Sequence, residues 1–163
     1  MKLPSSVVAA ALALVPVVFT AASAQPTRTP SAAMLAPVQR WIDAYNAAQT
    51  LPDDIFTDDV VITDEFPPYA WSGRVGARAW GARIEQSFQK RRATHEHVVT
   101  GTPQAFMTSQ AGDRASFVLP ATLTYDVEGK TQTDRALWLF VVVKGGDNSW
   151  KIAADTWTQN NNQ

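Results

Sequence analysis

Asp64 is the residue whose type and position best suit acid–base chemistry. It follows the short β-branched segment 60–63, and on an extended strand its side chain shares a face with Val60 and Ile62. That face is apolar, so we expect it to point inward. A carboxyl group in an apolar cavity has a raised pKa and can move protons. The alternative interpretation is that Asp64 only caps the turn before Phe66.

The two histidines, His95 and His97, lie two positions apart in a segment that alternates as a strand. Both would point to one face, as an acid–base pair or as two metal ligands. A metal ion would need a third ligand, and the sequence has no cysteine and no further histidine. We predict no metal and no cofactor, since the sequence also has no phosphate-binding loop or nucleophile elbow. His97 is interpreted as a pocket residue, or alternatively as a hydrogen-bonded histidine near the sheet edge.

Aromatic residues are numerous, with six Trp, seven Phe and three Tyr. Some lie in a loop bent by two prolines, where they could form a pocket rim for a flat or apolar ligand. Packing in a core or dimer interface is the alternative. An inward-facing Asp155 would need a partner, because an unpaired buried carboxylate is unfavourable. The candidate ligand-binding residues are Trp41, Tyr45, Phe66, Tyr69, Trp71, Phe117, Trp138 and Asp155.

The first 24 residues have the pattern of a cleavable signal peptide. Lys2 precedes an apolar run over residues 7–19, and a small-x-small cleavage site ends at residue 24. The run is too short to span a bilayer, so we expect a periplasmic or secreted protein that does not stay in the membrane. Without these residues the net charge is (14 − 1) − 15 = −2, which argues against a nucleic-acid partner.

The remaining chain predicts one small α+β domain. Apolar residues recur at helical spacing from Leu35 to Tyr45 and again over 75–92, and strands are expected at 60–63, 94–106, 113–125, 131–144 and 150–158. Residues 25–34 are assigned to a flexible linker, 35–158 to the domain and 159–163 to a disordered tail. Two helices packed on one face of a curved, mainly antiparallel (mixed) sheet would enclose a cone-shaped cavity.

This order of elements resembles the nuclear transport factor 2-like superfamily, in its SnoaL-like and ketosteroid isomerase-like branch. The resemblance is carried by Val-Gln-Arg-Trp at 38–41 with Tyr-Asn-Ala at 45–47, Phe-Thr-Asp-Asp-Val at 56–60, Trp-Ser-Gly-Arg at 71–74 and Trp-Lys-Ile-Ala at 150–153. It implies a cone fold, a homodimer and a small-molecule ligand. It also places Asp64 where ketosteroid isomerases have their general base. Trp41 and Trp138 replace the tyrosine and the protonated aspartic acid of their oxyanion hole, so steroid isomerase activity is not expected.

Three functions remain open at this point. The first is an exported binding module that holds a small apolar or aromatic molecule without transforming it. The second is an isomerase, dehydratase or cyclase in which Asp64 is the base and His97 or Tyr69 assists. The third is an interaction protein that dimerises through its sheet, with the cone filled by Trp41, Trp138 and Phe117.

Overall fold

The computed structural model describes residues 29–159, which form two α-helices, a short 3-10 turn and one seven-stranded sheet. The predicted signal peptide, most of the predicted linker and residues 160–163 lie outside the described residues. In chain order the elements are α1 (Ala32–Asn46), η1 (Asp53–Ile55), β1 (Phe56–Thr63), β2 (Ala70–Ser72), α2 (Gly73–Arg91), β3 (Thr94–Thr100), β4 (Ala105–Thr108), β5 (Arg114–Val127), β6 (Lys130–Lys144) and β7 (Trp150–Gln159).

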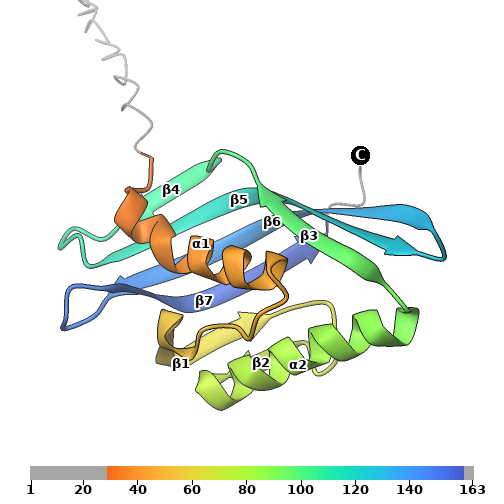
Figure 1. Cartoon of the computed structure of the whole chain (residues 1–163). Helices are drawn as coiled ribbons and strands as arrows, with labels where there is room; N and C mark the ends of the chain where they lie inside the picture. Colours follow the sequence, from red (N-terminus) through yellow and green to blue (C-terminus); the bar gives the residue numbers. More distant parts are fainter. Residues whose placement is uncertain (1–28, 160–163) are drawn as a thin grey trace, which may run out of the picture.

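The sheet is mixed, as predicted. Its strand order is β2-β1-β7-β6-β5-β3, and β4 also pairs with β5. Strands β1 and β7 run parallel to each other, and the other pairs are antiparallel. Helix α1 lies across the long strands, and α2 runs beside β1 and β2 (Figure 1). The predicted fold class, a curved mixed sheet with helices packed on one face, is therefore confirmed.

Helix α1 begins slightly before the predicted domain boundary at Leu35. Ser31 is its N-cap, and its side chain accepts a hydrogen bond from the backbone N–H of Met34. Residues 32–34, assigned above to the linker, are helical. At the other end of the chain, Gln159 belongs to β7 rather than to the tail. Both elements are thus a little longer than the sequence pattern indicated.

Asn46, the last residue of α1, ties this helix to β3. Its side-chain amide donates to the carbonyl of Val98 at 2.8 Å, and its Oδ1 accepts from the N–H of Val98 at 2.7 Å. The amide thereby satisfies both the backbone N–H and the backbone carbonyl of Val98, on a strand at the end of the sheet. This pair of hydrogen bonds fixes the C-terminal turn of α1, and with it Trp41 and Tyr45, against the concave face.

The core fills much of the cone. It is built from the inward positions of the strands, such as Ile62, Phe140, Val142 and Ile152, and from the buried stripe of α1. Phe117 belongs to this core, with 1% of its surface exposed and its ring 5.8 Å from that of Phe140. The period-two alternation of β5 and β6 explains this packing, because every second side chain points to the same side.

Candidate functional site

A cavity of about 140 Å³ remains between the two helices and the concave face of the sheet. A cavity of about 150 Å³ accommodates a benzene molecule, so this space matches one aromatic ring. Four of the predicted ligand-binding residues line it, namely Trp41, Tyr45, Phe66 and Trp138. Asp64, the predicted base, also lines it. The cavity is far too small for a steroid, which agrees with the expectation from the two tryptophan positions.

Indole rings form one continuous wall of the cavity. The ring of Trp138 meets that of Trp41 edge-on at 4.7 Å and that of Trp157 at 5.2 Å. Tyr45 stacks on Trp41 with ring centroids 5.1 Å apart and nearly parallel planes. Such offset and edge-to-face contacts are favourable and hold each ring in one orientation. A flat ligand would therefore meet a preformed aromatic surface.

The indole nitrogen of Trp41 is buried and has no hydrogen-bond partner among residues 29–159. An unsatisfied buried N–H is energetically unfavourable. Trp41 itself lines the cavity, so this unused donor belongs to a residue of the cavity wall. A ligand oxygen that reached it would recover the lost hydrogen bond.

Asp64 is held in one orientation by two donors. The indole N–H of Trp80 donates to Oδ2 at 2.8 Å, and the backbone N–H of Glu65 donates to Oδ1 at 2.6 Å. Burial raises the pKa of Asp64, and these two hydrogen bonds oppose part of that rise. The result is a positioned carboxylate with increased basicity, which is suited to accepting a proton from a ligand.

Asp155 lies behind the aromatic wall instead of lining the cavity, so its assignment as a ligand-binding residue is corrected. Only 1% of its surface is exposed, and the indole N–H of Trp138 donates to its Oδ1 at 2.5 Å. Its Oδ2 has no partner within the described chain. Burial, reinforced by the charge of Asp64, raises the pKa of Asp155 to about 8. The carboxyl is therefore mainly protonated at neutral pH and acts on the cavity through Trp138.

Charged side chains surround the rest of the cavity. Arg91 lies over the rings of Phe88 and Tyr125, with its guanidinium carbon 4.8 Å and 5.5 Å from their centroids. Glu65 accepts the backbone N–H of Gln159 at 2.9 Å, and burial raises its pKa. With the carboxyl of Asp134 nearby in the lining, these groups make the surroundings of the indole wall polar.

His97 and Tyr69 are exposed and do not line the cavity, so neither can assist Asp64. Val98 faces the core, which turns its neighbours His97 and Val99 outward. Glu96, two positions from Val98 on the same face of β3, instead accepts a hydrogen bond from Tyr45 and lines the outer groove between α1, α2 and β3. Tyr69 is 60% exposed.

Trp71 and Phe117 also lie outside the cavity lining. Trp71, on β2, pairs with Ile62 and is 7% exposed within the hydrophobic core. Phe117 belongs to the same core. Both were predicted from residue type, which does not distinguish a core aromatic from one that lines a cavity.

Trp80 is the functional residue that sequence reasoning missed. It lies on the apolar stripe of α2, which predicted core packing, and its ring is indeed buried. Its N–H nevertheless reaches Asp64, sixteen positions earlier in the chain. Other lining residues not predicted as such are Glu65, Ile84, Phe88, Arg91, Val98, Leu123, Asp134, Trp157 and Gln159.

Within residues 29–159, no three His, Asp or Glu side chains converge on a point where a metal ion could bind. In the same range, neither helix combines the length and apolar character needed to cross a bilayer.

Several solved structures share this fold at low sequence identity. A ketosteroid isomerase-like protein from Erwinia carotovora atroseptica is 18% identical, with a TM-score of 0.58 over 78% of this chain and 94% of that one. A hexachlorocyclohexane dehydrochlorinase of type 2 is 13% identical, with a TM-score of 0.63 over 79% and 84%. An NTF2-like protein with a cystatin-like fold from Novosphingobium aromaticivorans is 12% identical, with a TM-score of 0.59 over 78% and 80%.

No family model and no curated protein matches the sequence. The structural similarity therefore establishes the fold alone, since all three identities are low. This chain has the nuclear transport factor 2-like cone fold, and the resemblance seen in its sequence is confirmed at that level. Because one fold supports many functions, the function has to be argued from the cavity.

The raised pKa of Asp155 predicts a pH-dependent stability. The folded protein binds a proton here up to about pH 8, whereas the unfolded chain releases it near 3.8. Between these values stability falls as pH rises, by at most about 1.4 kcal/mol per pH unit. Asp155→Asn keeps an acceptor for Trp138 and cannot ionise. The free energy of unfolding, measured in urea, should therefore increase for Asp155→Asn relative to the wild type from pH 4 to pH 8.

Asp59→Asn, on the exposed side of β1, is the matched control and should follow the wild-type curve. Parallel curves for Asp155→Asn and the wild type would show that Asp155 is ionised in the folded protein.

Proposed function

We propose that this protein binds a small molecule of about one aromatic ring in the interior cavity. The observation that carries the proposal is the match between a 140 Å³ space and a preformed wall of indole rings. Apolar and aromatic lining with few polar groups is typical of small-molecule sites. The fold is compatible with this function, because proteins with this fold include both binders and enzymes.

Two polar groups at the cavity suit a ligand that carries a hydroxyl or carbonyl group. The unpartnered N–H of Trp41 would donate to the ligand oxygen. Asp64 would accept a hydrogen bond from a ligand hydroxyl, because the two donors it already has leave lone pairs free. Phenol has the ring, the size and the hydroxyl group for both contacts, and it is a suitable probe.

Filling the cavity should abolish phenol binding. Leu123, on the inward face of β5, lines the cavity, and Leu123→Trp would occupy much of the space for one ring. We expect phenol affinity, measured by isothermal titration calorimetry, to fall at least about tenfold, since a ring loses most of its burial. Val75→Trp, on the exposed side of α2, should bind like the wild type. Equal phenol affinity in both variants, or none in the wild type, would refute binding in this cavity.

The second candidate function is proton transfer by Asp64. Its placement at the cavity, its two fixed donors and its raised pKa favour it as a general base. The reaction class would be isomerisation, dehydration or cyclisation of a single-ring compound. His97 and Tyr69 have no part in this proposal because they are exposed.

Isomerisation of 3-cyclohexenone to 2-cyclohexenone tests this candidate with a substrate of suitable size. Asp64 would remove a proton from C2 and return it to C4, while Trp41 stabilises the dienolate oxygen. Asp64→Asn should lower the rate about 10²-fold or more. The wild-type rate should rise with pH through the raised pKa of Asp64, because the base acts when ionised. His97→Ala is the control and should keep the wild-type rate; if Asp64→Asn does so too, Asp64 is not the base.

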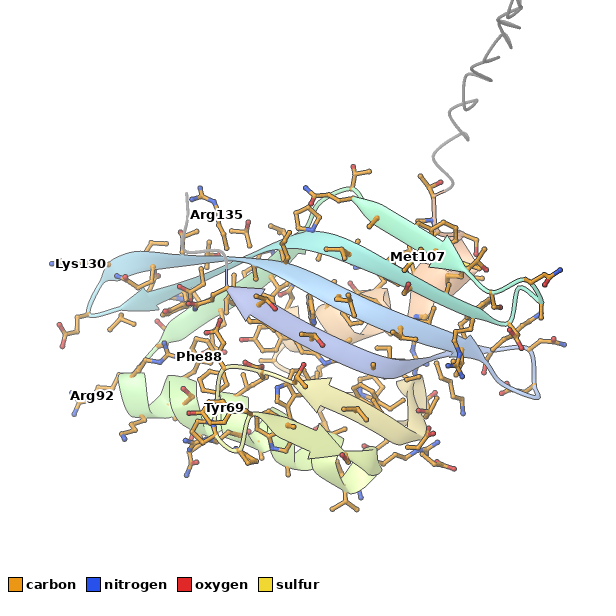
Figure 2. All side chains as sticks on the ribbon, turned by 180° about the vertical axis from the view of Figure 1, so that it is seen from behind. Tyr69, Phe88, Arg92, Met107, Lys130 and Arg135 are labelled. Atoms are coloured by element: carbon orange, nitrogen blue, oxygen red, sulfur yellow. The ribbon has the colours of Figure 1, made fainter. Side chains whose placement is uncertain are left out.

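We further propose that the protein is exported to the periplasm or the medium and forms a homodimer through the outer face of the sheet. The export proposal rests on the amino-terminal sequence pattern. The dimer proposal rests on the face opposite α1, which Figure 2 presents to the viewer with Met107 on it. Leu137, Leu139, Val61 and Met107 are exposed there.

This outer face suits a second copy of the same chain. In the register of the sheet, Val141 lies beside Ala154, and Leu139 lies beside Thr156, which in turn lies beside Thr63. These central rows are free of charge. A two-fold interface brings like residues together, so an uncharged apolar patch can pair with itself without repulsion.

Leu139→Lys should convert a dimer to a monomer in size-exclusion chromatography with light scattering. Two lysines would face each other near the axis and lose their hydration. Val75→Lys, on α2, should leave the dimer intact. A wild-type monomer at micromolar concentration, or a Leu139→Lys dimer, would refute this interface.

A further inference from the structure

Two side chains separate the interior cavity from a second, larger space. This outer groove, of about 930 Å³, lies between the C-terminal end of α1, the middle of α2 and the beginning of β3. Tyr45 and Ile84 are the residues that line both the groove and the interior cavity. We call this pair the partition. Because Tyr45 and Ile84 line both spaces, the groove and the cavity adjoin at these two residues.

The partition is held by ring stacking and apolar packing, with one long hydrogen bond. The hydroxyl of Tyr45 donates to Glu96 over 3.4 Å, which is long for an O–H···O hydrogen bond. The ring of Tyr45 stays in place mainly by stacking on Trp41. Ile84 is half-buried and contributes only apolar packing. Shortening Ile84 therefore removes material from the partition without breaking a hydrogen bond.

On its far side the partition opens onto an apolar strip. Ala77, Gly81 and Ile84 follow one another at helical spacing and line one side of α2 along the groove. Leu51 packs on this strip at Gly81, since a Cβ added at Gly81 would come within 3.3 Å of its Cδ1, and its side chain is part of the same apolar surface. Arg78 and Asp53, whose Nη1 and Oδ2 atoms are 2.6 Å apart, form an ion pair at the border of this strip. A second ring placed beyond the partition would thus find an apolar surface.

We propose that the Tyr45–Ile84 partition determines ligand length: it restricts the wild-type protein to single-ring ligands, and its removal joins the groove to the cavity and admits two-ring ligands. This inference rests on the proposed ligand-binding function. Ile84 is accordingly a specificity-determining residue. The natural ligands are single-ring compounds that carry no rigid substituent on the side of the ring opposite their hydroxyl or carbonyl group.

Phenol and 4-phenylphenol test the proposal, because they share the hydroxyl group and differ by one ring. Isothermal titration calorimetry on the protein without its predicted signal peptide would give both dissociation constants for the wild type, Ile84→Val and Ile84→Ala. We expect the wild type to prefer phenol. Ile84→Ala should bind 4-phenylphenol at least about tenfold more tightly than the wild type does, since the second ring gains a buried surface. Because Ile84 also lines the cavity, its truncation should weaken phenol binding, so the preference for phenol over 4-phenylphenol should fall at least about tenfold.

Val75→Ala, which also truncates an aliphatic residue of α2 but at a 73% exposed position, is the control and should match the wild type. Ile84→Val should show an intermediate gain and keeps the test valid if Ile84→Ala does not fold. Wild-type protein that binds both compounds equally, or folded variants without any gain, would overturn the role of the partition and leave the binding function standing. Absence of binding by every protein would overturn both.

Discussion

The arrangement of the site depends on the hydrogen bond from the Trp138 indole to the buried carboxyl of Asp155. A carboxyl group at this depth is tolerable because its raised pKa favours the neutral form and because the indole donates a hydrogen bond to it. The bond fixes the plane of Trp138, whose ring then meets Trp41 and Trp157 edge-on. Trp80 holds Asp64 in the same way. Two indole–carboxyl pairs thus organise the site: Trp138–Asp155 lies behind the cavity wall, and Trp80–Asp64 lies at the cavity.

This use of tryptophan also determines the size of the cavity. The indole rings of Trp41, Trp80 and Trp138 belong to the core that fills much of the cone, and about 140 Å³ is left. The third interpretation of the sequence, a cone filled by Trp41, Trp138 and Phe117, therefore describes part of the interior correctly. The remaining space is nevertheless lined by a positioned carboxylate and next to an unpartnered indole N–H. Those two groups favour a ligand site over a purely structural interior.

Local patterns predicted the fold well because hydrophobic periodicity directly reflects which side of an element is buried. The helical repeat from Leu35 to Tyr45 and the alternation along β5 and β6 both match the observed inner faces. The prediction for His97 was wrong for a similarly local reason. Val98 faces the core, so its neighbour His97 faces outward. A single-residue change of phase moves every side chain of a strand to the other face, and no composition signal reports it.

The sequence by itself determined the α+β class, the inward face of β1 and hence the place of Asp64, because these follow from spacing within one element. Tertiary structure alone decided which aromatic residues form the core and which line the cavity, since that depends on the distance between elements far apart in the chain. It also decided the partners of the carboxyl groups: Trp80 lies sixteen positions from Asp64, and Trp138 seventeen from Asp155. The pairing of β6 with β7 brings Trp138 to Asp155, and the packing of α2 beside β1 brings Trp80 to Asp64.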